Sequence, residues 1–467
     1  MIKKDFTRSF ELKEATIKEI HEYFKSGKLT CRELVEFYID RINKFDKKGP
    51  SLNTVIKLNP KALEKADELD KQFAEDGFVG PLHGIPVLLK DNVDTYDLET
   101  TAGSLSLKNV RPKNDAHITK KLREAGAIIL AKTNLHEFAI WGETLSSILG
   151  QTLNPYDLTR TPGGSSGGTA AGIASNFGMV GIGTDTVNSV RSPASACNLV
   201  GFRPTVGMIS RDGIVPYSLT QDSAGPITRT VEDAVRVLKV ISGYDENDPK
   251  TAWSFNNIPD DLESYLKTDG LNNKKIGILR SFLGDHEIHK EVNNAFENCV
   301  TVMKENGAGI VDIKEEIDSD KLISEVSLHL YELKAALNSY LKDLGERSEL
   351  NSLSEIFKSD KYHPGIEENI KKALKLEIGT PEYNERLIKR QELRDKVMNM
   401  MAQYELDIII YPHQKRPVVQ VGGSQVERNG VIGSLTGFPA CVLPGGFTKA
   451  TETAPLGVPI GIEMLAR

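Results

Sequence analysis

Two clusters of hydroxyl-bearing residues within one glycine-rich segment are the strongest candidates for chemistry in this sequence. The first, GGSSGG, spans residues 163–168, and the second, GTDTVNSVR, spans residues 183–191. A serine hydroxyl can attack an electrophilic carbon once a base removes its proton, so both clusters are candidates for nucleophilic catalysis. The glycines free the backbone for tight turns and leave the hydroxyls uncovered. A flexible glycine–serine linker is the alternative interpretation of the first cluster.

The residues after the first cluster argue against a linker. TAAGIA at 169–174 is apolar and indicates a buried helix, so we expect the glycine loop to be held between packed elements. A Walker-type phosphate loop is excluded because that motif needs a lysine and then a serine or threonine after its last glycine. Here Thr169 follows Gly168 directly.

Lys90 is the most unusual charged residue, because it directly follows the apolar run at 86–89, which predicts a buried strand. Sites in α/β proteins usually lie at the carboxyl ends of strands, which favours a desolvated, functional lysine. A lysine that extends from a sheet edge into solvent is the alternative. His136 has no second histidine near it in the sequence, and we interpret it as a structural residue.

Composition excludes several classes of protein. The 467 residues carry a net charge of −7, which provides no attraction to nucleic acid or to an anionic membrane surface. The N-terminus lacks the apolar core of a signal peptide, and no run approaches the roughly 20 apolar residues of a membrane span. The four cysteines are widely spaced and form no CxxC pair, which argues against a zinc site and a disulfide framework. We therefore expect a cytoplasmic protein without a metal or other cofactor, and without a nucleic-acid or membrane partner.

Apolar periodicity predicts an α/β protein whose sheet is built from both ends of the chain. Helices are expected within 12–45, 59–74, 117–126, 230–241 and 287–305. Strands are expected at 86–89, 127–131, 178–183, 199–204, 206–215, 276–279, 309–313, 406–411, 440–443 and 459–464. Residues 320–402 have a mostly charged helical pattern, interrupted around Gly345 and Pro364, and we interpret them as a lid or wall over the site.

Three segments in this order resemble the amidase signature family of serine amidohydrolases: GIPVLLKDNVDT at 84–95, TPGGSSGGTAAG at 161–172 and GTDTVNSVRSPASACNLVGFRPT at 183–205. Flanking blocks at 154–168, 210–234 and 436–447 extend the resemblance over nearly the whole chain and are most similar to the peptide-amidase branch. The resemblance implies an amidase-signature-like α/β fold, with a large mixed β-sheet flanked by helices on both faces. It also implies one domain over 1–467, with a catalytic core at about 60–240 plus 404–467 and a variable, mostly helical region at about 245–403.

The resemblance also assigns roles to individual residues. Ser189 matches the family's acyl nucleophile, Ser165 matches the bridging serine that is held by a cis peptide bond, and Lys90 matches the general base. The remaining assignments are the oxyanion-hole backbone N–H groups of Thr186, Val187, Asn188 and Ser189, and the supporting side chains of Asp185, Arg191 and Ser166.

These roles agree with what amide hydrolysis requires, namely an activated hydroxyl, a proton carrier and donors for an oxyanion. No Ser/His/Asp set is evident, which is consistent with a lysine base. At a pKa of roughly 10.4, lysine is neutral in only about one molecule in 2,500 at pH 7. Burial must therefore lower the pKa of Lys90 by about three units if this residue is to accept a proton.

The chain departs from the family pattern at two places. Val187-Asn188 stands where most relatives have two glycines, and a valine tolerates positive φ poorly. We expect either a smaller or differently shaped acyl pocket or reduced activity. The sequence also ends at Arg467, where relatives usually continue into a closing helix, which suggests a truncated C-terminus.

The leading hypothesis is an amidohydrolase that cleaves a small-molecule or peptide C-terminal amide through a Ser189 acyl-enzyme, giving a carboxylate and ammonia or an amine. The alternatives are the amidase subunit of a tRNA-dependent amidotransferase and a catalytically silent amide-binding relative. The sequence leaves the oligomeric state open, with a homodimer as one alternative.

Overall fold

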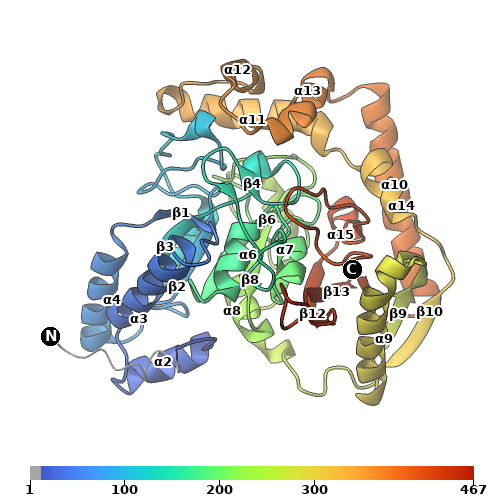
Figure 1. The fold of residues 1–467 in the computed structure, drawn as a ribbon, viewed down its shortest axis with the longest axis horizontal. Coiled ribbons are helices and arrows are strands. Elements are labelled where there is room, and N and C mark those ends of the chain that lie inside the picture. The colour runs from blue at the N-terminus through green and yellow to red at the C-terminus, as the bar shows by residue number, and fades with distance from the viewer. Residues whose placement is uncertain (1–11) are drawn as a thin grey trace.

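An eleven-stranded mixed sheet forms the centre of the molecule, as the computed structural model shows for residues 12–467, the part of the chain that it describes. The strand order is β1-β3-β2-β6-β8-β7-β12-β13-β11-β9-β10. Strands from the first half of the sequence therefore lie on one side, strands from the second half lie on the other, and the two groups meet where β7 pairs with β12. The predicted α/β class and the sheet built from both ends of the chain are confirmed (Figure 1).

The strands of this sheet are β1 Val55–Leu58, β2 Pro86–Lys90, β3 Ile128–Thr133, β6 Val180–Asp185, β7 Val200–Arg203, β8 Ser223–Thr228, β9 Lys275–Leu279, β10 Gly309–Ile313, β11 Ile408–Pro412, β12 Ala440–Phe447 and β13 Pro459–Leu465. A separate two-stranded hairpin pairs β4 Leu145–Ser146 with β5 Gly150–Gln151.

The helices are α2 Ile17–Lys25, α3 Cys31–Arg41, α4 Ala62–Asp76, α5 His117–Glu124, α6 Gly167–Ala174, α7 Arg191–Ala196, α8 Val231–Ile241, α9 Lys290–Glu305, α10 Ser319–Lys321, α11 His329–Leu344, α12 Leu353–Ser359, α13 Glu367–Lys375, α14 Pro381–Gln403 and α15 Ile432–Thr436. A π-helical turn, η8 Leu322–Val326, follows α10. The capping box predicted for the second helix is present, since the Thr30 side chain accepts from the Glu33 N–H and the Glu33 carboxylate accepts from the Thr30 N–H.

Helices and loops cover both faces of the central strands. Every residue of β2, β3, β6 and β8 is buried. Because successive side chains of a strand point to opposite faces, burial of all of them requires cover on both sides. The predicted large mixed sheet flanked by helices on both faces is therefore confirmed.

The parallel pairing of β2 with β6 positions the candidate site. Val87, Leu88 and Leu89 pair with Val180, Gly181 and Ile182 in the same direction. The carboxyl end of β2, at Lys90, therefore lies beside the carboxyl end of β6, at Thr184 and Asp185. The polar residues at the ends of β2 and β6, which are far apart in the sequence, therefore lie at the same edge of the sheet.

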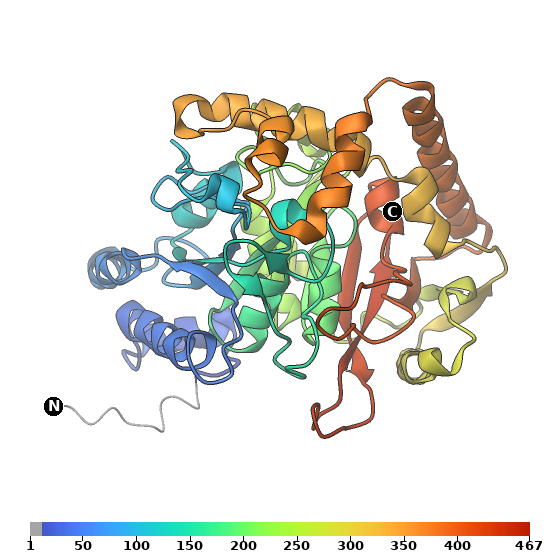
Figure 2. The ribbon, with the colours of Figure 1, turned by 45° about the horizontal axis from the view of Figure 1, so that its top comes forward.

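The helical segment from α11 to α14 packs against the rest of the molecule rather than standing apart from it (Figures 1 and 2). Leu333, Leu337 and Leu341 of α11 share an apolar cluster with Phe138 and Tyr217 from loops beside the sheet. Residues of α14 pack in a second cluster with residues of β11, β13 and α15.

One sequence-based expectation about the strands was wrong. Residues 206–215 form a loop that makes only isolated bridges, from Ile209 to Ser242 and from Ile214 to Val93. The strand lies later, at Ser223–Thr228, and it contains Gly225 and Pro226. Both residue types are rare in strands, so local propensity hides an element that tertiary pairing with β6 and β7 creates.

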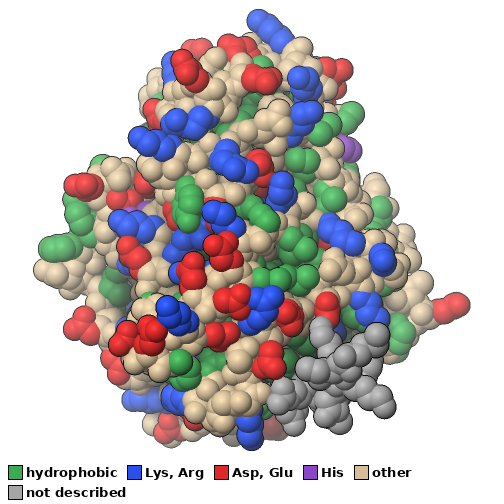
Figure 3. All heavy atoms as spheres, turned by 90° about the vertical axis from the view of Figure 1, so that its left-hand side faces the viewer, with side chains coloured by type: hydrophobic (Ala, Val, Ile, Leu, Met, Phe, Trp, Pro, Cys, Tyr) green, Lys and Arg blue, Asp and Glu red, His purple; other side chains and the backbone are tan. Residues whose placement is uncertain are grey.

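Charges of both signs are interspersed on the face shown in Figure 3, and no extended area of one sign is visible there. Among residues 12–467, no helix is both long and apolar enough to cross a membrane.

Candidate active site

Lys90 lies fully buried at the end of β2, and its side chain contacts both serine-cluster segments. Its Nζ donates to Ser165 Oγ at 2.7 Å and to Thr184 Oγ1 at 2.8 Å. The alternative of a lysine that extends from a sheet edge into solvent is therefore wrong.

Burial lowers the pKa of Lys90 from 10.5 to about 7, and the negative charges of Asp185 and Asp222 oppose this effect only in part. A buried ammonium loses its hydration, so the neutral amine becomes accessible near neutral pH. This pKa matches the lowering by about three units that a lysine base requires.

The first serine cluster is rigidly enclosed. Ser165 and Ser166 are both fully buried, and the peptide bond between Gly164 and Ser165 is cis. A Cβ at Gly168 would lie 2.3 Å from the backbone oxygen of Asn134, so only glycine fits where α6 begins beside that loop. The alternative of a flexible linker is wrong.

Ser166 joins the two serine clusters. Its backbone N–H donates to the Ser189 carbonyl at 3.2 Å, and its Oγ donates to the Thr184 carbonyl at 3.2 Å. The Thr184 N–H in turn donates to Ser166 Oγ at 3.3 Å. These bonds hold the turn that carries Ser189 against the loop that carries Ser165.

Ser189 lies on the turn between β6 and α7, where it is 6% exposed and lines a cavity of about 460 Å³. We call this cavity the acyl pocket. Within residues 12–467 no hydrogen bond joins the Ser165 and Ser189 hydroxyls directly, so their connection runs through the backbone bond from Ser166.

The turn before Ser189 presents unused backbone donors. Within the described residues, no group accepts a hydrogen bond from the N–H groups of Thr186, Val187, Asn188 or Ser189. All four residues line the acyl pocket. Neither Val187 nor Asn188 has a positive φ, so the turn does not need the glycines that the family pattern has at these positions.

Asp185 and Arg191 form a buried ion pair that fixes this turn. Arg191 donates to the Asp185 carboxylate from Nε and Nη2, both at 3.1 Å, and to the Val187 carbonyl at 2.7 Å. The Val190 N–H and Arg203 Nη1 also donate to Asp185, at 3.1 and 2.9 Å. The pKa of Asp185 is held well below its usual value because the two guanidinium charges outweigh the cost of burial.

The outer part of this network was not predicted from the sequence. Glu463 of β13 pairs with Arg191 and also accepts from Tyr411 Oη at 2.9 Å and from His413 Nδ1 at 2.6 Å. A carboxylate within the apolar late strand PIGIEML was the available signal, because a buried charge needs a partner. No role was predicted for Arg203 or Asn92, although both lie in the motifs that carry the family resemblance. Asn92 Nδ2 donates to Thr184 Oγ1 at 3.0 Å.

The far wall of the acyl pocket comes from the helical segment and from the loop before α15. It consists of Ser319, Asp320, Ile323, Ser324, His329 and residues 425–428. His136 lies outside this wall; it is buried, which lowers its pKa to about 3, and its Nδ1 accepts from the Glu143 N–H at 3.1 Å. These contacts suit a neutral, structural histidine.

The described residues contain no group of three or more histidine, cysteine, aspartate or glutamate side chains able to hold a metal ion. The polar groups in contact with Lys90 Nζ are the hydroxyls of Ser165 and Thr184 and the Thr184 carbonyl.

Comparison with known proteins places the chain in a family. The amidase family model matches residues 33–467. The chain is 34% identical over 468 residues to a probable amidase from Arabidopsis thaliana, an alignment that covers 97% of this chain and 87% of the relative.

Solved structures give the same result. A peptide amidase from Stenotrophomonas maltophilia is 32% identical with a TM-score of 0.85, covering 97% of this chain and 93% of that one. A glutamyl-tRNA(Gln) amidotransferase subunit from Thermotoga maritima is 27% identical with a TM-score of 0.74, covering 100% and 92%. The chain belongs to the amidase family, and it is a hydrolase of carbon–nitrogen amide bonds.

Proposed function

We propose that Ser189 is the nucleophile of this amidase, that Ser165 relays protons and that Lys90 is the base. The observation that carries this proposal is the 2.7 Å hydrogen bond between Ser165 Oγ and the buried Lys90 Nζ, whose pKa is about 7. An amine that is neutral near pH 7 can accept a proton through the intervening hydroxyl.

In the acylation step, Ser189 Oγ attacks the amide carbon while its proton passes to Ser165 Oγ and the Ser165 proton passes to Lys90 Nζ. The C–O bond forms, and the carbonyl π electrons move to the oxygen of a tetrahedral intermediate. When the intermediate collapses, the C–N bond breaks, Lys90 Nζ returns a proton to Ser165 Oγ, and Ser165 passes one proton to the leaving nitrogen. Ammonia or an amine departs, and Ser189 carries the acyl group.

Water then takes the place of the leaving amine. Its oxygen attacks the ester carbon while one of its protons passes through Ser165 to Lys90. The bond between the acyl carbon and Ser189 Oγ then breaks, the proton returns from Lys90 through Ser165 to Ser189 Oγ, and the carboxylic acid is released. The backbone N–H groups of residues 186–189 would stabilise the oxyanion in both steps, because no described group accepts from them and the residues that carry them line the acyl pocket. Asp185 and Arg191 support the proposal by bracing this turn, and Ser166 by linking it to Ser165.

We propose that the substrate is a peptide C-terminal amide or a similar small amide. The higher TM-score to the peptide amidase, 0.85 against 0.74 for the amidotransferase subunit, supports this choice. The amidotransferase subunit is the second candidate, since its fold is also shared over the whole chain. Co-purification with a tRNA-binding subunit would favour the second candidate.

We further propose one domain over residues 1–467, with the core at about 60–240 plus 404–467 and the region at about 245–403 as a wall that shapes the acyl pocket. The lining residues from 319 to 329 support that role for the wall.

A cytoplasmic location is proposed because the four cysteines are free thiols. A homodimer is a further proposal, to be tested by sedimentation.

Release of ammonia from C-terminally amidated peptides, simple amides and glutamine tests the proposed function. Ser189→Ala should abolish turnover without changing the fold, whereas Ser192→Ala, a matched serine-to-alanine change three residues along the chain, should retain activity. A fluorophosphonate probe should label Ser189 in the parent and not in Ser189→Ala. An unlabelled parent would identify a catalytically silent relative, and full turnover by Ser189→Ala would remove the nucleophile assignment.

A further inference from the structure

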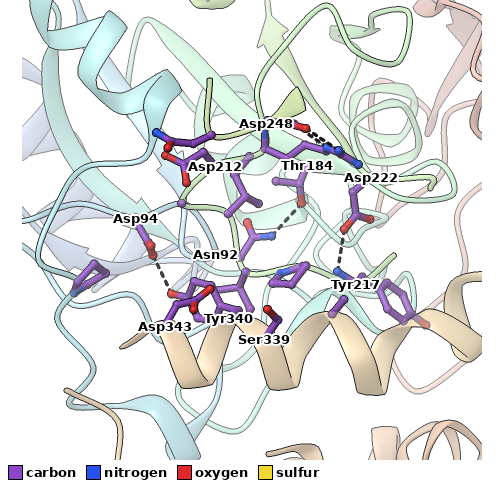
Figure 4. A pocket seen from close by; sticks show the side chains of 18 of the residues that line it. Asn92, Asp94, Thr184, Asp212, Tyr217, Asp222, Asp248, Ser339, Tyr340 and Asp343 are labelled. Carbon is purple, nitrogen blue, oxygen red and sulfur yellow. Dashed lines mark hydrogen bonds and ion pairs between the residues drawn. The ribbon is translucent and has the colours of Figure 1, made fainter. Parts of the chain in front are cut away.

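A second cavity, of about 470 Å³, lies next to the acyl pocket. The two cavities share Ala139, Thr186 and Tyr217 as lining residues, but Ser189 lines only the acyl pocket. We call the second cavity the acidic pocket; its side chains include Asn92, Asp94, Asp212, Asp222, Ser339 and Asp343 (Figure 4). Neither the family assignment nor the proposed mechanism gives it a role.

Four carboxylates of the acidic pocket form no ion pair with a described residue. Asp94 follows β2 and Asp222 directly precedes β8, and both are buried; Asp212, in the loop before β8, and Asp343, on α11, are exposed. The pocket also contains two basic residues without an ion pair in this part of the chain, Lys113 and Arg347, but both side chains are exposed. Of these charged residues without an ion pair, Asp94 and Asp222 are the buried ones, so the buried end of the pocket is acidic.

Two carboxylates that line this pocket, Asp248 and Asp222, already have protein partners. Asp248 pairs with Arg211 at 2.7 Å. Asp222 accepts from Thr186 Oγ1 at 2.6 Å and from two backbone N–H groups. They contribute negative charge, but they do not need a ligand.

The inner end of the acidic pocket presents hydrogen-bond acceptors. Asp94 is 6% exposed, and one of its oxygens accepts from Tyr340 Oη at 2.9 Å. Asn92 is 2% exposed, and its Oδ1 has no hydrogen-bond partner among the described residues. Figure 4 shows both side chains reaching into the same cavity. An unpartnered buried acceptor is costly, so a ligand that donates hydrogen bonds would be stabilised here.

The side chains that line the acidic pocket favour an organic cation over a metal ion. No group of three or more metal-ligating side chains exists among residues 12–467. A primary ammonium needs fewer protein ligands than a metal ion. It carries one positive charge and three N–H donors, which can be shared between a carboxylate and an amide oxygen. We propose that the acidic pocket binds a small primary alkylammonium ion, with its head group between the Asp94 carboxylate and Asn92 Oδ1.

The electrostatics of Asp94 agree with this assignment. Burial raises the pKa of its carboxyl to about 7, and the opposing effect of the Lys132 charge is too small to cancel the effect of burial. Lys132 is already paired with Asp91, at 3.2 Å. A cation bound beside Asp94 would offset the desolvation of its charged form.

The proposed ligand would lie one side chain away from the base. Asn92 Nδ2 donates to Thr184 Oγ1 at 3.0 Å, and Lys90 Nζ donates to the same oxygen at 2.8 Å. The acidic pocket is therefore adjacent to the reaction centre without including the reacting atoms. Amines and ammonium are one of the two product classes of amide hydrolysis, so a ligand of this class is formed where the pocket is located.

Calorimetric titration of the full chain with n-butylammonium chloride tests the proposal. We expect saturable 1:1 binding of this probe, and none of sodium butyrate or 1-butanol, which have the same chain length without the positive charge. Asp94→Asn should weaken binding by about tenfold or more, because a charge-assisted bond is lost. Asp269→Asn makes the same change of charge at an exposed position outside the pocket and should bind like the parent.

Ser339→Lys provides a second variant that leaves Asp94 intact. Ser339 is exposed on α11, and Figure 4 shows it at the pocket, so a lysine there should exclude the probe without disturbing the core. Ser189→Ala should bind the probe as tightly as the parent, which separates this proposal from the catalytic one. Equal binding of butyrate, unchanged binding in Asp94→Asn and Ser339→Lys, or no binding by the parent would overturn the assignment.

Discussion

Replacing Lys90 with methionine should stabilise the protein near neutral pH, by an amount that shrinks as the pH rises. The lysine is fully buried, and its pKa falls from 10.5 to about 7 when the chain folds. Methionine has a similar length and no charge to desolvate. The variant therefore removes a destabilising contribution of the active site, as well as the proposed base.

The sign follows from proton binding. Between about pH 7 and 10.5 the unfolded chain holds a proton on Lys90 that the folded chain does not, so the Lys90 contribution to the free energy of unfolding rises with pH. The slope is about 1.4 kcal/mol per pH unit, and the total over this window is about 5 kcal/mol. Loss of the hydrogen bonds to Ser165 and Thr184 offsets about 1 kcal/mol each. We expect a net gain of about 3 kcal/mol at pH 7, and a net loss near pH 10.

Urea unfolding at about pH 7, 8 and 9 measures the effect, with the free energy extrapolated to zero denaturant. The difference between Lys90→Met and the parent should fall by about 1.4 kcal/mol for each pH unit. Lys18→Met makes the same substitution at an exposed position on α2 and is the matched control. Parallel stability curves for Lys90→Met and the parent would refute a lysine that is neutral in the folded protein near pH 7.

Three further predictions concern the same region. The value of kcat/KM for an amidated peptide should rise with pH through a midpoint near 7, as Lys90 loses its proton; a flat profile from about pH 6 to 8 would contradict a lysine base. Glu463→Gln should destabilise the protein by about 3–5 kcal/mol, because it leaves the buried Arg191 only partly neutralised. Thermal unfolding measures this loss, and Glu452→Gln, the same change at an exposed position, is the control. Gly168→Ala should cost at least about 1–3 kcal/mol and lower activity, because its Cβ would overlap the backbone of Asn134; unchanged urea midpoints would show that this loop can move.

The elements that were predicted well from the sequence carry their own local signals. The segment with β9, α9 and β10 has clear apolar periodicity between turns, and the helix that begins at Cys31 has a complete capping box. β8 has no such signal, because Gly225 and Pro226 are poor strand residues and only the neighbouring strands make this segment extended. Local sequence patterns therefore predict the elements whose own residues favour a helix or a strand. They do not predict an element whose conformation is determined by tertiary contacts.

The candidate site shows the same limit at longer range. Lys90, Ser165 and Ser189 could be proposed because their motifs are short and continuous in the sequence. Glu463 could not, because it lies 272 residues from its partner Arg191 and no local pattern joins them. A single buried carboxylate in a predicted strand indicates that a partner exists, but only the fold shows which one.

The buried charges around the turn that carries Ser189 also explain how Lys90 can be neutral beside an aspartate. Asp185 favours the protonated amine, yet burial outweighs it. Arg191 and Arg203 donate to this carboxylate, so its negative charge is largely compensated before it acts on Lys90. Glu463 in turn neutralises Arg191. The arginines therefore have two effects: they hold the turn that presents Ser189, and they limit the field that would otherwise keep the lysine protonated.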